Sequence, residues 1–87
     1  MATPIARIRK AIETEFSRRE IELKRSKSGS ITGWITSDSF ADQSEIERMQ
    51  RVFKLLEAHL SAQDRKNVLV IWPITRLERK VLLEDEE

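Results

Sequence analysis

The longest regular pattern of apolar positions lies in the middle of the chain, between residues 44 and 60. Apolar residues recur there every three or four positions, which places them on one face of a helix. They are Ile46, Met49, Phe53, Leu56 and Leu60, with Val52 widening the stripe. Ser44 and Glu47 form the S-x-x-E pattern of a capping box, which predicts that the helix begins at Ser44. We expect its apolar face to be buried, with Phe40 packed near its start.

Two further patterns precede this helix. Thr3 and Pro4 are typical of a helix start, and apolar residues at helical spacing predict that this first helix runs to about Ser17. From residue 20 the period changes to two, which predicts a strand over residues 20–24. The polar turn 26–30 then leads into a β-branched, aromatic strand over 31–37. The two strands should form a hairpin, and Gly33 within the second predicts a bulge or a close approach of the backbone.

Three further elements are predicted after the central helix. Residues 61–66 are polar and should hold a short helical turn, whereas residues 68–72 are apolar at both parities. Such a run is typical of a strand covered on both faces, so we expect it to be the central strand and to end at Pro73. Thr75 and Glu78 repeat the capping box and predict a last helix up to about Leu83.

These elements predict the fold class. Their order is α-β-β-α-(α)-β-α, which we interpret as an α+β fold: a three-stranded mixed sheet with helices on one face. A chain of 87 residues has room for one domain, which we assign to residues 1–83. Residues 84–87 are all acidic and form a C-terminal tail in this interpretation.

Composition narrows the function classes. With 39% hydrophobic and 36% charged residues the chain should fold, and no apolar run is long enough to span a bilayer. It contains no cysteine, which excludes disulfides and thiolate metal sites and is compatible with a cytoplasmic location. The formal net charge is +1, but residues 1–30 carry eight basic side chains against four acidic ones. Such a basic half can attract anionic partners, although charge of this kind is more often a solvated face.

We find no catalytic constellation in the sequence. The single histidine, His59, has no metal-ligating residue three or four positions away on its predicted helix. Glu45 and Glu47 have Arg48 and Arg51 at helical spacing, which is typical of solvated ion pairs. We therefore expect a protein that is not an enzyme and holds no cofactor or metal.

One stretch resembles a known family. Its residues are Ser37, Asp38, Phe40, Ser44, Ile46, Arg48, Val52 and Phe53. This pattern is similar to the signature of BolA proteins, and the order of elements is the one that BolA proteins share with class II KH domains. The chain departs from the family where Asp42 replaces a glycine, Gln43 a frequent lysine, and Met49 and Gln50 a histidine and an arginine.

The BolA resemblance implies a small adaptor that pairs with a monothiol glutaredoxin around an iron–sulfur cluster, or a transcription regulator. The family's ligand histidine stands at the start of the last strand, where this chain has Asn67, and residues 26–30 supply no second ligand. The resemblance therefore implies an adaptor or regulator without a cluster. The surface that it implies for nucleic acid or a partner comprises Arg48, Arg51, Arg65 and Lys66, to which we add the aromatic Trp34.

Two other interpretations stay open. The first is a KH-like module that binds DNA or RNA through the basic N-terminal half. It lacks the G-x-x-G loop of KH domains, because Gly29 and Gly33 are too far apart and lie on the hairpin. The second is a homodimer formed through an uncovered sheet face around Trp72.

Overall fold

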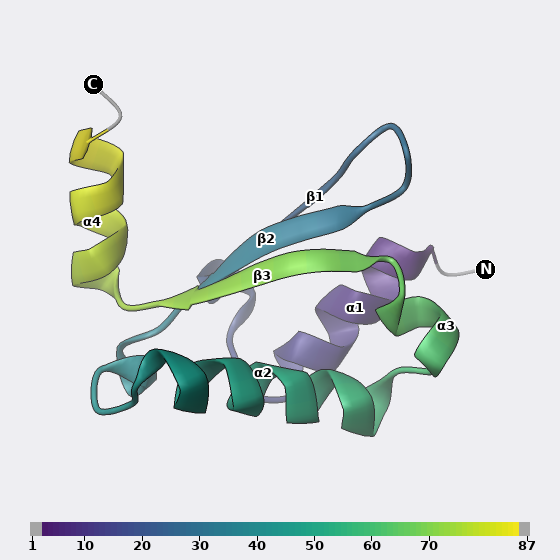
Figure 1. Cartoon of the computed structure of the whole chain (residues 1–87), viewed down its shortest axis with the longest axis horizontal. Helices are drawn as coiled ribbons and strands as arrows, with labels where there is room; N and C mark the ends of the chain where they lie inside the picture. Colours follow the sequence, from purple (N-terminus) through teal and green to yellow (C-terminus); the bar gives the residue numbers. More distant parts are fainter. Residues whose placement is uncertain (1–2, 86–87) are drawn as a thin grey trace.

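The computed structural model describes residues 3–85 and confirms the α+β class with a three-stranded mixed sheet (Figure 1). Helices α1 and α2 cover one face of the sheet, and α4 leaves the end of β3 and extends away from α2. The elements in order are α1 (Pro4–Glu13), η1 (Arg18–Glu20), β1 (Ile21–Arg25), β2 (Ile31–Thr36), η2 (Asp38–Phe40), α2 (Glu45–His59), α3 (Ala62–Arg65), β3 (Val68–Ile74) and α4 (Arg76–Asp85).

The strand order differs from the prediction in one respect. The predicted hairpin is confirmed, since β1 and β2 pair antiparallel, while β2 and β3 pair parallel. The order is β1-β2-β3, so the prediction that residues 68–72 form the central strand was wrong. The strand is apolar at both parities because Ile71 enters the core while Trp72 stays half exposed on the other face. Strand β3 is therefore an edge strand with an unpaired side.

Pro73 does not end this strand as predicted, because β3 continues to Ile74. A proline is tolerated on an edge strand when its missing N–H would have pointed away from the ladder. The parallel pairing is irregular between Ile31 and Thr32, where β3 advances from Val68 to Val70 and leaves Leu69 without a register partner. Leu69 is 71% exposed at this bulge.

Gly33 makes the close backbone approach that its place in the second strand predicted. A Cβ atom there would overlap the backbone oxygen of Glu22 and lie 2.7 Å from Cδ2 of Leu23 on the neighbouring strand. The structure also settles which parity of β2 faces the core, since Ile31, Gly33 and Ile35 are buried. Trp34 consequently lies on the outer face of the sheet.

The first helix begins as predicted but ends earlier. The Thr3 hydroxyl caps it by accepting a hydrogen bond from the Ala6 N–H, 3.3 Å away. Helix α1 ends at Glu13, not at about Ser17, and the hydroxyl of Thr14 donates to the Ala11 carbonyl over 2.7 Å. A side chain that bonds the backbone in this way competes with a further helical turn. Phe16 nevertheless reaches the core from the following turn.

The capping box at Ser44 is confirmed, and Val52, Leu56 and Leu60 are buried as predicted, but the prediction that Ile46, Met49 and Phe53 are buried was wrong. Arg48, Val52 and Leu56 face the interior, whereas Ile46, Met49 and Phe53 are 71%, 47% and 59% exposed. Helix α2 therefore carries two apolar stripes and buries one. The buried apolar core is made of Ile8, Ala11, Ile12, Phe16, Ile21, Ile31, Ile35, Phe40, Val52, Leu56, Leu60 and Ile71.

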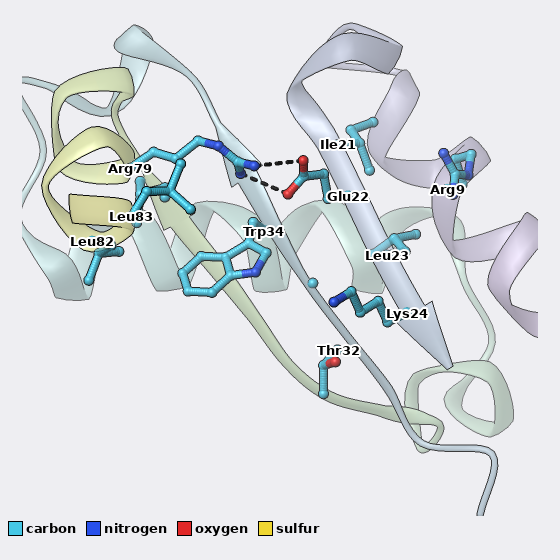
Figure 2. Close-up of a pocket in the computed structure, with 12 residues that line it drawn as sticks. Arg9, Ile21, Glu22, Leu23, Lys24, Thr32, Trp34, Arg79, Leu82 and Leu83 are labelled. Carbon is cyan, nitrogen blue, oxygen red and sulfur yellow. Dashed lines mark hydrogen bonds and ion pairs between the residues drawn. The ribbon is translucent and has the colours of Figure 1, made fainter. Parts of the chain in front are cut away.

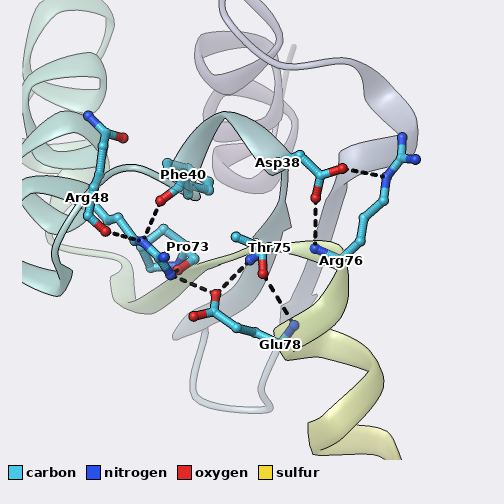
Figure 3. A network of polar contacts seen from close by, with 8 residues as sticks. Asp38, Phe40, Arg48, Pro73, Thr75, Arg76 and Glu78 are labelled. Atoms are coloured by element: carbon cyan, nitrogen blue, oxygen red, sulfur yellow. Dashed lines mark hydrogen bonds and ion pairs between the residues drawn. The ribbon is translucent and has the colours of Figure 1, made fainter.

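Arg48 determines which stripe of α2 turns inward. Its Nε donates to the backbone oxygens of Phe40 and Gln43, both at 3.0 Å, and its Nη1 lies 2.6 Å from Oε1 of Glu78 on α4 (Figure 3). Nη1 also approaches the Pro73 carbonyl at 3.5 Å. One guanidinium thus joins the loop before α2, the end of β3 and the start of α4.

The second capping box is also confirmed. The Thr75 N–H donates to Oε1 of Glu78 over 2.8 Å, and the Glu78 N–H donates to Oγ1 of Thr75 over 3.2 Å. Helix α4 continues to Asp85, two residues past the predicted limit, and residues 86–87 of the predicted tail lie outside the described residues. Within the described part of the chain, no helix is both long and apolar enough to cross a membrane.

Replacing Arg48 should be costly because its carbonyl partners are buried. We expect Arg48→Ala to lower the free energy of unfolding by about 2–3 kcal/mol, since hydrogen bonds to a charged donor are lost and the Phe40 oxygen stays desolvated. Arg48→Met, which keeps most of the volume, should recover only a small part of the loss. Urea denaturation followed by circular dichroism measures both, with exposed Lys54→Ala as control. Equal stability of all three variants would show that the guanidinium contributes nothing.

The contacts of Glu78 also predict a pH dependence. The backbone N–H of Thr75 and the guanidinium of Arg48 hold the pKa of Glu78 below its usual 4.5. A carboxylate with a lowered pKa stabilises the fold above the pKa of the unfolded chain, and this contribution is lost as the pH falls through the folded pKa. We therefore expect the unfolding free energy to fall between roughly pH 5 and pH 3, and to fall less in Glu78→Gln than in the exposed control Glu57→Gln. Parallel pH profiles for these two variants would contradict the assignment.

Candidate binding surface

The exposed stripe of α2 adjoins the unpaired edge of β3. Met49 and Phe53 from the helix and Leu69 from the bulge line a groove whose cavity volume is about 240 Å³. Val52, Leu56 and Ile71, which are buried, line it from the core side, and Arg65 from α3 also lines it. We call this the edge groove. Its lining is apolar except for the cation of Arg65.

A shallower hollow of about 400 Å³ extends this groove along α2. It is lined by Met49, Gln50, Phe53 and Lys54, so Lys54 adds a second cation beside the same two apolar side chains. Lys66, next to Arg65 in the chain, is exposed where α3 ends. Basic residues thus lie both in the lining of these hollows and close to it in the chain.

A second groove lies between α2 and α4. Its volume is about 460 Å³, and it is lined by apolar Met49, Trp72, Pro73, Ile74, Val81 and Leu82 together with charged Glu45, Arg48 and Glu78. We call it the α4 groove. It shares Met49 with the edge groove, so the two grooves adjoin at α2.

The outer face of the sheet holds a third and larger hollow of about 640 Å³ (Figure 2). Trp34 lies on its floor beside α4, and the Arg79 guanidinium bonds both carboxylate oxygens of Glu22 at 2.7 Å. Trp34 also packs on Trp72, with 6.2 Å between ring centroids. The bidentate pair neutralises the charge at this end of the face and holds α4 against β1.

The structure distributes the predicted site residues over different surroundings. Arg48 is buried in the contacts described above. Arg51 stacks over the rings of Phe16 and Phe40, 4.9 and 5.0 Å from their centroids, so its guanidinium supports the core. Arg65 and Lys66 lie near each other beside the edge groove, whereas Trp34 lies on the outer face of the sheet. Of the five predicted site residues, only Arg65 and Lys66, which are neighbours in the chain, therefore lie together.

The spacing of apolar residues did not predict the exposed stripe of α2. Ile46, Met49 and Phe53 have the spacing of a buried stripe, which predicts that they lie in the core. A signal was present, since the predicted stripe already contained Val52 and Leu56, and Leu55 beside them widens it beyond what one face of a helix can bury. The sequence did not indicate that Leu69 is exposed, because a run of apolar residues does not show where a bulge lies.

The donors at the implied cluster position are weak iron ligands. Asn67 stands just before β3, half-buried, with its backbone oxygen accepting from the Ile31 N–H at 2.7 Å. In the hairpin turn, the hydroxyls of Ser26, Ser28 and Ser30 bond one another at 2.8 and 3.4 Å. Neither an amide nor an alcohol replaces a thiolate or an imidazole on an iron–sulfur cluster. Among residues 3–85, no three His, Asp or Glu side chains gather as a metal site would require.

Comparison with known proteins supports the fold and leaves the function open. No protein-family model matches the sequence, and no curated protein matches it. Two solved structures are similar: BolA1 from Arabidopsis thaliana, at 18% identity and a TM-score of 0.67, and the BolA domain of SufE1 from Arabidopsis thaliana, at 22% and 0.65. Each match covers 90% of this chain and 98% of the other. The chain therefore has the BolA-like fold that its sequence predicted.

Proposed function

We propose that this chain is a non-catalytic adaptor that binds a partner protein through the edge groove, without an iron–sulfur cluster. The observation that carries the proposal is the exposed stripe of α2. Exposed apolar patches rimmed by polar residues are typical of protein interaction sites. Here Met49, Phe53 and Leu69 line one groove, whereas α2 buries Arg48, Val52 and Leu56 on another face.

The charges beside the groove indicate the chemistry of the partner. Lys54 and Arg65 line the apolar hollows, and Lys66 lies close by. A complementary segment presents apolar side chains for the groove and carboxylates for these cations, because opposite charges across an interface favour encounter and fix orientation. The resemblance to BolA proteins makes a monothiol glutaredoxin the first partner to test. The transcription-regulator role that the resemblance also implies needs a DNA contact, for which Arg48 and Arg51 are already engaged inside the fold.

Substitutions in the edge groove should separate binding from folding. Phe53→Glu puts a carboxylate in the centre of the apolar strip, and we expect it to weaken the complex with an apo monothiol glutaredoxin by about tenfold or more. Arg65→Glu should weaken it less, and more at low salt than at high salt. Titration calorimetry at two salt concentrations measures both effects. Thr32→Glu, on the outer face of the sheet, is the control and should bind like the unmodified chain.

The same complex tests whether the adaptor works without a cluster. Co-expression of the two proteins under iron-replete conditions should give a complex with no visible absorption that depends on this chain. A cluster absorption that disappears in Asn67→Ala would overturn the cluster-free proposal and leave the groove intact. Unchanged affinity in Phe53→Glu would overturn the groove.

Nucleic-acid binding is the alternative function, and ion pairs within the fold occupy part of the basic N-terminal half that would carry it. Arg7 binds Asp64 through two hydrogen bonds of 2.8 Å, and Arg18 lies 3.6 Å from Glu13. Exposed cations without such partners among the described residues include Lys24 and Lys27 near the hairpin turn. We expect no shift in the fluorescence anisotropy of single-stranded DNA or RNA at low salt. Binding that weakens steeply with salt would favour the alternative.

A further inference from the structure

Met49 is the one sulfur-bearing side chain in the part of the chain that the structure describes. The chain contains no cysteine and two methionines, of which Met1 lies outside residues 3–85. Met49 is 47% exposed on α2 and does not belong to the buried core. Peroxides oxidise an accessible thioether to a sulfoxide, and dedicated enzymes reverse the reaction. An oxidant in solution can therefore reach this side chain without opening the fold.

Met49 also occupies the point at which three surface hollows adjoin. It lines the edge groove, the shallower hollow that extends this groove along α2, and the α4 groove. Of the described residues, it alone lines all three of these hollows. A chemical change at this one side chain therefore alters the lining of each of them.

The surroundings of Met49 suit a thioether better than a sulfoxide. Apart from Arg65, every residue that lines the edge groove together with Met49 is apolar. In the α4 groove, the cation of Arg48 already bonds two backbone carbonyls and Glu78. Methionine packs well against apolar and aromatic groups, because its unbranched chain and polarisable sulfur adapt to them. A sulfoxide puts a polar oxygen, which accepts hydrogen bonds, in the place of that apolar sulfur.

The cost of this oxygen differs between the free chain and a complex. In the free chain water hydrates the oxygen, and Gln50 and Lys54 beside it offer hydrogen-bond donors. In a complex at the edge groove, apolar side chains of the partner displace that water. Burying an acceptor without a donor is unfavourable. Oxidation of Met49 therefore opposes binding and leaves the fold intact.

We propose that Met49 is a redox-sensitive modification site that switches off partner binding at the edge groove. This inference rests on the proposed function and adds its regulation. The co-reactant is hydrogen peroxide or an organic hydroperoxide. A sulfur lone pair attacks the terminal peroxide oxygen, the S–O bond forms as the O–O bond breaks, and water or an alcohol leaves with the proton of the transferred oxygen. Sulfur gives up two electrons to the peroxide, and a thiol-dependent methionine sulfoxide reductase returns them.

Peroxide treatment of the whole chain tests the proposal. Intact mass and peptide mapping identify the chain oxidised at Met49, and titration calorimetry measures its affinity for an apo monothiol glutaredoxin. We expect binding to be about tenfold weaker after oxidation and to recover after treatment with the reductase. Circular dichroism should show the same fold throughout. Met49→Leu is the matched control, because it keeps an apolar side chain of similar volume. Whatever affinity this variant starts from, peroxide should not change it.

A measurement without the partner separates this inference from the proposed function. The dye anilinonaphthalene sulfonate carries an apolar ring system and a sulfonate, which match the apolar lining and the cations of Lys54 and Arg65. The part of its fluorescence that is lost in Phe53→Glu reports on the edge groove. Oxidation of Met49 should remove most of this part. If the reduced chain binds the dye in this way but does not bind the glutaredoxin, the partner is wrong and the modification site stands.

Three results would overturn the proposal. In the first, peroxide leaves Met49 unmodified in the folded chain. In the second, the oxidised chain binds the glutaredoxin as tightly as the reduced chain does or, where neither form binds it, takes up the dye equally. In the third, Met49→Leu loses affinity on peroxide treatment to the same extent as the unmodified chain, which would place the sensitive group elsewhere.

Discussion

The fold depends on the orientation of α2 about its own axis, which decides which of its two apolar stripes faces the sheet. The helix is long enough to cover the sheet, but a sheet of three strands offers it a single apolar face. Val52 and Leu56 occupy that face together with Arg48. Because the Arg48 guanidinium must reach the Phe40 and Gln43 carbonyls, the helix cannot rotate to bury Ile46, Met49 and Phe53 without leaving those carbonyls unpaired.

The orientation of α2 also determines what the protein can do. The stripe left outside meets the open edge of β3, where the bulge turns Leu69 outward, and further along it meets Trp72 and α4. In an 87-residue domain with a small core, apolar side chains that stay in water add nothing to the stability of the fold. A binding surface, as proposed above, gives a physical reason for their exposure. The proposed binding surface consists of the exposed stripe of α2 and the open edge of β3.

Much of the fold followed from local rules. The capping boxes at Ser44 and Thr75, the hairpin around residues 26–30 and the close approach at Gly33 depend on neighbours in the chain, and each was predicted correctly. The strand order was not, because an apolar run is equally consistent with a central strand and with an edge strand that displays a tryptophan. The inward stripe of α2 was missed for a related reason: a charged side chain was assumed to face water, whereas Arg48 finds its partners inside.

The central claim is the orientation of α2, and solvent paramagnetic relaxation measures it most directly. A soluble paramagnetic agent broadens the methyl signals of side chains that water reaches. In spectra recorded at low protein concentration, the methyl signals of Ile46, Met49 and Leu69 should broaden strongly. The methyl signals of Ile12, Val52 and Leu56 should stay sharp. Protection of Ile46 and Met49 together with broadening of Val52 would contradict the account.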